Sequence, residues 1–282
     1  MKLITLSRVG VLFLFVLCLQ GNAREAYYPK IFIDNLKSKD IEDRDLKYRI
    51  KDIVQNYHYA GRDGHDIISS FCPQGKSCTR QISSFSYKDA RKYLFGTLHL
   101  QKDSQGYYLE DVYCQQTYRS DDGVGVNRIP NHQKINCEHT WPQSKFSKTE
   151  SKHTQKVDLH HLFPVSMRAN STRSNHPLAE VSGRMVNSNC TDAFIGKAHG
   201  TNQTAFEPPN EHKGDAARAI FYFAARYGLT IDDLQETNLR KWHMEDPVSP
   251  AEQVRNDLIE DYQKNRNPFI DYPQLVDMIE NF

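Results

Sequence analysis

The hydrophobic and polar positions between residues 135 and 175 predict two short strands followed by a helix. Apolar residues run through 135–141 and 157–165, and the prolines at positions 142 and 164 end the first run and interrupt the second. Residues 166–175 follow as a short helix, with Ser166 as its N-cap and Asn170 one turn further on. A strand, loop, strand and helix of this size is a compact way to hold a histidine opposite a metal ligand.

The segments before this motif predict a mixture of helix and hairpin. Charged and apolar residues alternate at helical spacing within 24–62, and a loop bounded by cysteines follows over 71–80. Ser86, with Asp89 three residues on, predicts a capped helix that Gly96 stops. Residues 98–100 and 107–114 are expected to pair as a hairpin.

Helices are predicted to dominate the C-terminal third of the chain. Residues 183–210 are rich in Asn, Gly and Thr and are expected to be mostly loop. The expected helices are 215–227 ended by Gly228, a helix capped by Thr230 running through Trp242, a helix from Ser249 to about Asn265, and a last one from Pro273 through Ile279. With no internal repeat or linker, we expect one mixed α+β domain over 24–282, in which 24–85 is a helical N-terminal extension.

The first 23 residues have the pattern of a secretory signal peptide. Lys2 and Arg8 precede an apolar run from Val9 to Leu19, and the small residues Gly21 and Ala23 suit cleavage. The run is far shorter than the ~20 residues that span a bilayer. We therefore expect a secreted or periplasmic protein that has no membrane-spanning segment.

The net charge limits how the protein can bind nucleic acid, and the cysteines indicate its redox compartment. The formal net charge is +1, and loss of Lys2 and Arg8 with the leader would make it −1, so any nucleic-acid binding must come from a local patch or a metal. Outside the leader the cysteines are Cys72, Cys78, Cys114, Cys137 and Cys190. Cys72 and Cys78 form the obvious local disulfide loop, the other pairings stay open, and an odd count leaves at least one thiol unpaired within the chain.

The motif over 136–175 carries residues suited to phosphodiester hydrolysis. A histidine is neutral near pH 7 and can take a proton from water, and His139 is the candidate general base. Glu138 and Asn170 offer oxygen ligands, which suit Mg²⁺, or Ca²⁺ or Mn²⁺, rather than Zn²⁺. Neighbours on a strand face opposite ways, so Glu138 and His139 can share one site only where the strand ends, twists or bulges.

Two further expectations concern the surroundings of these residues. The second ring nitrogen of His139 should meet a backbone carbonyl near Lys156 or Val157. Asn170 could instead be a polar helix residue, and it also begins an Asn-Ser-Thr glycosylation sequon.

Other charged residues in the region have two possible roles each. Asp158, His160 and His161 are expected to support the site structurally rather than bind metal, because strand alternation separates the two histidines; a Zn²⁺ site is the alternative. A Lys-rich loop over 145–156 could contact nucleic-acid phosphates or simply be solvated. The candidates for gripping phosphates are Lys145, Arg168, Arg173, Arg184, Arg218 and Arg226, of which Arg218 and Arg226 could equally form buried ion pairs.

Several ordered motifs resemble the endonuclease I family of secreted bacterial nucleases. They are Asn-Cys-Glu-His-Thr-Trp-Pro-Gln at 136–143, Asp-Leu-His-His-Leu-Phe-Pro at 158–164, Asn-Ser-Thr-Arg-Ser-Asn at 170–175, Glu-Pro-Pro-Asn at 207–210 with Gly-Asp-Ala-Ala-Arg at 214–218, Trp-His-Met-Glu-Asp-Pro-Val at 242–248 and Asn-Arg-Asn-Pro-Phe at 265–269. The resemblance covers roughly residues 90–269. It implies a ββα-metal (His-Me finger) core.

By position, the resemblance implies the same roles for His139, Glu138 and Asn170, with one Mg²⁺. It implies cleavage of DNA, and often RNA, with little sequence preference and with 5′-phosphate ends. The chain departs from the family at Lys156, where some members have Glu, and over 145–156, where some have a Cys-rich loop with an arginine. The family arginine that contacts the scissile phosphate therefore has no counterpart that can be carried over.

These observations favour a secreted, metal-dependent, non-specific endonuclease acting on DNA and RNA as a monomer. One alternative is a secreted nucleic-acid-binding module with an inactive site, although a pure binder would need more positive charge. Another is a Zn²⁺-dependent hydrolase that uses Asp158, His160 and His161.

Overall fold

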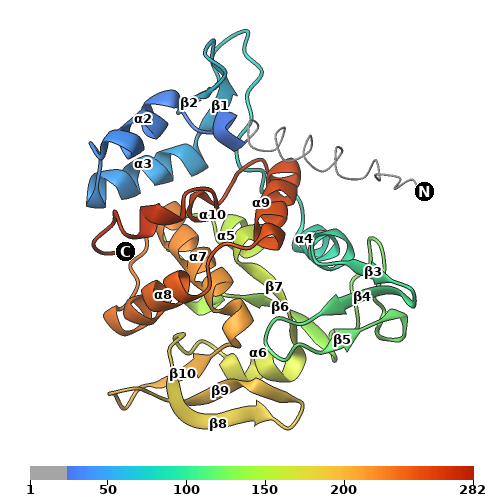
Figure 1. Ribbon diagram of the computed structural model, residues 1–282. Helices are drawn as coiled ribbons and strands as arrows, with labels where there is room; N and C mark the ends of the chain where they lie inside the picture. The colour runs from blue at the N-terminus through green and yellow to red at the C-terminus, as the bar shows by residue number, and fades with distance from the viewer. Residues whose placement is uncertain (1–23) are drawn as a thin grey trace, which may run out of the picture.

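The computed structural model describes residues 24–282, so the predicted signal peptide over 1–23 lies outside the described residues. The helices are α2 (Lys30–Ser38), α3 (Asp43–Gln55), α4 (Tyr87–Tyr93), α5 (Lys152–Val157), α6 (Met167–Arg173), α7 (Asn210–Tyr227), α8 (Asp233–Glu245), α9 (Pro250–Gln263) and α10 (Pro268–Asp271). The strands are β1 (Tyr57–Ala60), β2 (Asp66–Ser69), β3 (Gln101–Asp103), β4 (Gly106–Glu110), β5 (Thr117–Tyr118), β6 (Ile135–His139), β7 (Leu162–Ser166), β8 (Val181–Asn187), β9 (Cys190–Ala198) and β10 (Thr204–Glu207). This mixture of helices with small antiparallel sheets is the α+β class that the sequence predicts (Figure 1).

The strands β6 and β7 form the antiparallel hairpin that the sequence motif predicts. The amide of Thr140 donates to the carbonyl of His161, just beyond the last strand pair. Hydrogen-bonded and non-hydrogen-bonded pairs alternate along an antiparallel ladder. Cys137 and Pro164, three pairs further along, therefore oppose each other at a position without ladder hydrogen bonds. Pro164 therefore removes no bond from the ladder, and its own carbonyl accepts from the amide of Val112 at 2.9 Å.

The helix α6 follows β7 directly and completes a ββα unit. Ser166 is its N-cap, as predicted, because the Ser166 hydroxyl accepts from the amide of Ala169 at 3.2 Å. The predicted boundaries of both strands are wrong. The first strand ends at His139, and residues 157–161, expected to be strand, are the end of α5 and a 3₁₀ turn, Leu159–His161.

The long helix α7 crosses the interior. Every residue from Ala216 to Tyr227 is buried, and the helix contacts α3, α8, α10 and the turn at Leu159–His161. It begins five residues before the predicted start and ends, as predicted, at Gly228, whose φ of 62° is the left-handed conformation that glycine adopts without strain.

The prediction that residues 183–210 are mostly loop is wrong. The strands β8, β9 and β10 form a three-stranded antiparallel sheet there, in the order β10-β9-β8. Gly183 pairs with Gly196, and a Cβ on either would collide with the backbone of the opposite strand. Glycine, usually a loop signal, is thus used here for a close approach of two strands.

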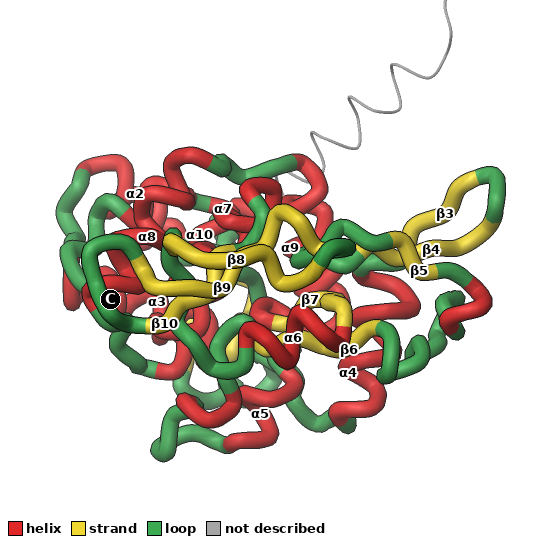
Figure 2. The backbone as a smooth tube through the Cα atoms, turned by 90° about the horizontal axis from the view of Figure 1, so that it is seen from below, coloured by secondary structure: helices red, strands yellow, loops and turns green. Residues whose placement is uncertain are grey.

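Smaller predictions were partly right. The Ser86–Asp89 capping box forms, but the chain continues through Gly96 in a π-helical turn, Leu94–Leu98. The hairpin exists with the bounds of β3 and β4, and it projects from the body of the molecule (Figure 2). The N-cap of α8 is Asp232 rather than Thr230, Ser249 caps α9 as expected, and the segment from Pro273 is a short 3₁₀ helix, Pro273–Val276.

The N-terminal segment 24–85 shares the core of the rest of the chain. It contains α2, α3 and the β1–β2 hairpin, and α3 packs against α7 (Figure 1). Buried residues of α2 and α3, such as Phe32 and Ile50, belong to the same apolar cluster as Phe221 and Trp242. Among residues 24–282, no helix combines the length and apolar content that crossing a bilayer would need.

Two disulfides are present among the described residues. Cys72–Cys78 closes the predicted short loop, and Cys114–Cys190 joins the segment after β4 to the start of β9. Cys137, on β6, has no disulfide partner among residues 24–282.

We expect the two disulfides to contribute unequally to stability. They close segments with sequence separations of 6 and 76 residues, and a longer loop loses more entropy in the unfolded chain. Replacing Cys114 and Cys190 by Ala should lower the free energy of unfolding by ~4 kcal/mol, against ~2 kcal/mol for the Cys72 and Cys78 pair. Guanidinium denaturation of both double variants measures this, and equal losses would contradict the loop-length account.

Candidate active site

The helix α6 is docked along the free edge of β6 by two of its side chains. The carbonyls of Cys137 and His139 point away from β7, because both residues occupy positions without ladder bonds. The Asn170 amide nitrogen donates to the Cys137 carbonyl, and Arg173 Nη1 donates to the His139 carbonyl, both at 3.4 Å. Asn170 and Arg173 thereby place α6 against the end of the strand that carries Glu138 and His139.

The carboxylate of Glu138 is buried on the same side as α6. Its Oε1 accepts from the hydroxyl of Tyr113 at 3.1 Å and lies 3.3 Å from Arg173 Nε. Burial raises the pKa of Glu138, and the Arg173 guanidinium and Tyr113 hydroxyl oppose that rise. Arg173 therefore helps to keep a carboxylate ionised where desolvation disfavours its charge.

The donor set around Glu138 fits a hard divalent cation. Glu138 supplies a carboxylate, and the side chain of Asn170 is turned so that its nitrogen faces the Cys137 carbonyl. Within residues 24–282 no group donates a hydrogen bond to the amide oxygen of Asn170, which leaves that oxygen available as a ligand. A carboxylate and an amide oxygen are ligands suited to Mg²⁺ or Ca²⁺.

His139 is held in one tautomer. Its Nε2–H donates to the carbonyl of Lys156 at 3.1 Å, which is where the sequence places the orienting carbonyl. Nδ1 is then the unprotonated nitrogen, and it accepts from the Gln143 amide nitrogen at 3.4 Å. Burial lowers the pKa of His139 well below its usual value, and the neighbouring His161 lowers it further, so the imidazole is neutral at pH 7.

The side chains of Glu138 and His139 leave β6 in different directions. Glu138 contacts Tyr113 and Arg173, whereas the His139 ring lies among the rings of Tyr87, Phe146 and His161. The strand ends at His139, which is one of the conditions under which neighbouring residues can serve a common site.

His160 and His161 lie on the 3₁₀ turn, which Asp158 caps, and each uses Nε2 in a hydrogen bond to a protein group, whereas their buried Nδ1 atoms have no partner among residues 24–282. The carboxylate of Asp158 accepts hydrogen bonds from several buried side chains and one amide, namely Gln81, Tyr222, Tyr227, Gln263 and the amide of His160. His160 Nε2 donates to the carbonyl of Asn265, and His161 Nε2 donates to that of Gln155. Across residues 24–282 no three His, Cys, Asp or Glu side chains are grouped as metal ligands, so the Zn²⁺ reading has no support.

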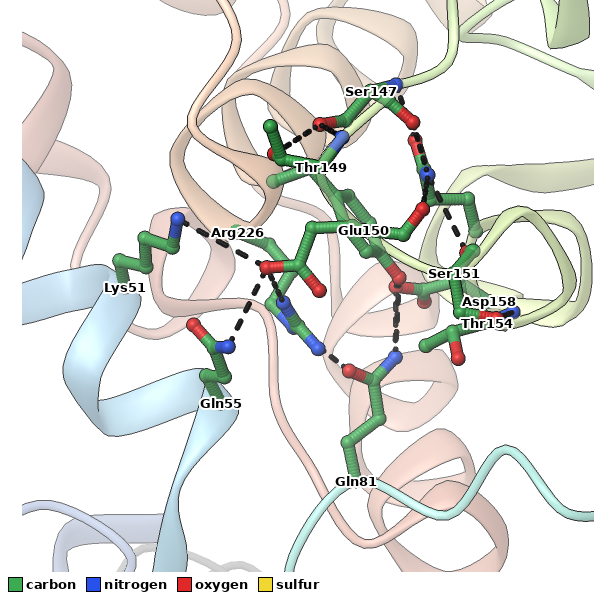
Figure 3. Close-up of polar contacts among 12 residues, drawn as sticks. Lys51, Gln55, Gln81, Ser147, Thr149, Glu150, Ser151, Thr154, Asp158 and Arg226 are labelled. Atoms are coloured by element: carbon green, nitrogen blue, oxygen red, sulfur yellow. Dashed lines mark hydrogen bonds and ion pairs between the residues drawn. The ribbon is translucent and has the colours of Figure 1, made fainter. Parts of the chain in front are cut away.

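The buried network around Asp158 continues to the N-terminal segment (Figure 3). Gln81 donates to Asp158 and accepts from Arg226 Nε at 2.8 Å. Arg226 also lies 3.7 Å from Glu150, which in turn accepts from Gln55 on α3 at 3.4 Å. The network therefore connects α3 to the loop before α5, the helix that carries the Lys156 carbonyl.

The predicted phosphate-binding residues divide into two groups. Arg173 and Arg218 are buried and paired, Arg173 with Glu138 and Arg218 with Glu252 at 2.7 Å, so phosphate contact by either has no support. Arg168 and Lys145 are exposed at the surface. Sequence reasoning missed Tyr113, Gln81 and Tyr227, because residues distant in the chain gave no pattern that joins them to Glu138 or Asp158.

A β-hairpin, a following helix and an oriented histidine at the end of the first strand together form a ββα motif. The chain belongs to the endonuclease I family, whose sequence model matches residues 76–274. It is 36% identical over 166 residues to an extracellular ribonuclease of Bacillus amyloliquefaciens, covering 51% of this chain and 53% of that protein. It is 27% identical over 140 residues to an endonuclease-1 of Buchnera aphidicola subsp. Baizongia pistaciae, covering 48% of this chain and 51% of that protein. The chain thus spans about half the length of these curated relatives.

The buried His161 should make stability depend on pH. Burial lowers the pKa of His161 to about 4, against ~6.5 for an unfolded histidine. As the pH falls from 6.5 towards 4, the unfolded chain binds a proton that the folded protein does not. The stability that the buried, neutral His161 contributes is therefore complete above pH 6.5 and is progressively lost below it. The loss of stability caused by His161→Gln, whose amide can still donate to Gln155, should therefore shrink by ~2 kcal/mol between pH 7.5 and 4.5.

Urea denaturation of the wild type and the variant at a series of pH values measures this difference. The same substitution at the exposed His153, on α5, is the matched control for replacing a histidine by glutamine. A His161→Gln difference that stays constant with pH would contradict the account.

Proposed function

We propose that the protein is a secreted, metal-dependent endonuclease that hydrolyses phosphodiester bonds of DNA and RNA without sequence specificity, leaving 5′-phosphate ends. The observation that carries the proposal is the neutral His139 at the end of β6, fixed by the Lys156 carbonyl with Nδ1 unprotonated, on the strand that also carries Glu138 and against which Asn170 is docked. Family membership and the names of the relatives, an extracellular ribonuclease and an endonuclease-1, support a nuclease.

His139 acts as the general base in the proposed reaction. Its Nδ1 takes a proton from a water molecule, whose oxygen bonds to phosphorus while the bond from phosphorus to the 3′ oxygen breaks. The 3′ oxygen takes a proton from solvent water and leaves as a hydroxyl, so the phosphate stays on the 5′ side. The Nε2–H bond to Lys156 keeps the proton on the other nitrogen, which holds the lone pair of Nδ1 ready.

General-base help alone is worth only ~10²–10⁴ in rate, so charge stabilisation must supply the larger share. Glu138 and Asn170 would hold the Mg²⁺, which when bound stabilises negative charge on the phosphate and on the leaving oxygen. Arg173 has an indirect part, since it keeps Glu138 ionised and fixes the end of α6 to β6.

A plasmid-nicking assay tests the proposal directly. The mature protein should nick and linearise plasmid DNA with Mg²⁺ and should lose that activity in EDTA. His139→Ala should lower the rate by ~10²–10⁴, and Glu138→Gln should abolish stimulation by Mg²⁺, because it removes the only carboxylate of the pair. Parallel assays on single-stranded RNA measure the RNA activity.

His132→Ala is the matched control, because His132 is an exposed histidine a few residues before β6. It should cleave at the wild-type rate. Full activity in EDTA would remove the metal from the mechanism, and nucleic-acid binding without cleavage would favour the reading of an inactive binding module.

A further inference from the structure

A tyrosine beside the catalytic histidine is flanked by two cations. Tyr87, the first residue of α4, has its ring centroid 5.7 Å from that of His139. The Lys156 ammonium lies 4.5 Å from the centroid of the Tyr87 ring, and the Arg91 guanidinium carbon lies 4.9 Å from it. Arg91 is one turn after Tyr87 on α4, and Lys156 is in the last turn of α5, so two contacting helices bring the cations together.

Neither cation is neutralised by the protein. Throughout residues 24–282, Arg91 and Lys156 form no ion pair with a carboxylate, whereas the buried Arg173 and Arg218 do. Arg91 Nε is buried and has no hydrogen-bond partner within the described part of the chain, 24–282. An unpaired donor removed from water is costly unless a ligand satisfies it, and two cations against one ring also repel each other. Both features point to an anion as the missing partner.

We propose that Tyr87, Arg91 and Lys156 form a phosphate-binding subsite for the nucleic-acid backbone, next to the bond under attack. The proposal rests on the nuclease function proposed above. Arg91 offers a guanidinium fork and Lys156 a point charge, both of which bind phosphate in proteins, and both lie against the ring of Tyr87. Because the centroid of that ring is 5.7 Å from that of the His139 imidazole, the phosphate that they take is a neighbour of the scissile one.

The test measures how binding depends on salt. Each lost contact to a single-strand phosphate should reduce the slope of log affinity against log salt by ~0.7. We expect this reduction for Arg91→Gln and again for Lys156→Gln, measured by fluorescence anisotropy with a labelled single-stranded oligonucleotide. The full mature chain is used in a His139→Ala background with EDTA, so that no substrate is cleaved.

The N-terminal segment supplies matched controls. Arg80 lies 4.5 Å from the ring of Tyr57, and Lys76 lies 5.7 Å from that of Tyr59, in the same cation-over-tyrosine arrangement at the β1–β2 hairpin. This hairpin and the β6–β7 hairpin lie apart in the fold (Figure 1). Arg80→Gln and Lys76→Gln should therefore leave the salt slope unchanged. Arg91→Lys keeps the charge and should restore most of the slope, which separates loss of a phosphate contact from a folding defect.

A second measurement uses the proteins with His139 intact. Arg91→Gln and Lys156→Gln should raise KM for oligonucleotide cleavage by roughly tenfold or more, as expected for a lost charged hydrogen bond, with a smaller change in kcat. Unchanged salt slopes in both variants, or equal reductions in the Arg80 and Lys76 controls, would overturn the subsite. If the wild type fails to cleave but the slopes fall as expected, the subsite stands and the nuclease proposal fails.

Discussion

The hydrogen bond from His139 Nε2 to the Lys156 carbonyl is the constraint on which the candidate site depends. It decides which ring nitrogen can accept a proton, and a carbonyl can enforce this choice because it only accepts. The carbonyl is itself placed by the end of α5 and the turn at Leu159–His161, which the buried Asp158 carboxylate holds through its many donors. The position of one proton thus rests on a network of buried polar groups.

This network also gives the N-terminal segment a physical connection to the site. The family match begins at residue 76, yet α3 packs on α7 and reaches the loop before α5 through Gln55 and Glu150. Buried polar groups are stable only when they are satisfied, so Gln81 and Arg226 tie the extension to Asp158 as well as filling space. A substitution in α3 would therefore affect the position of the Lys156 carbonyl through groups that have no catalytic role.

The sequence predicts the parts of the fold that are encoded locally. The caps at Ser86, Ser166 and Ser249, the helix end at Gly228 and the Cys72–Cys78 loop depend on residues only a few positions apart, and all are found. The turn containing His160 and His161 was mistaken for strand, because a short apolar run has no periodicity that separates the two. Glu138 is contacted by Tyr113 and Arg173. The tertiary fold brings these side chains to it, so the spacing of residues along the sequence does not predict the contacts.

The charges around the site explain how a chain with a net charge near zero could bind a polyanion. Arg173 offsets Glu138 in a buried pair, and His139 is neutral, so these residues together contribute little net charge. Arg91 and Lys156 remain in excess at the ring of Tyr87 beside His139, and neither forms an ion pair with a carboxylate among the described residues. The electrostatic attraction of such a local excess of positive charge extends over about 10 Å at moderate salt. This distance matches the size of a cleavage site rather than that of the whole surface. In the proposed subsite, the attraction for phosphate would therefore be concentrated beside the proposed general base, and the overall composition does not reveal it.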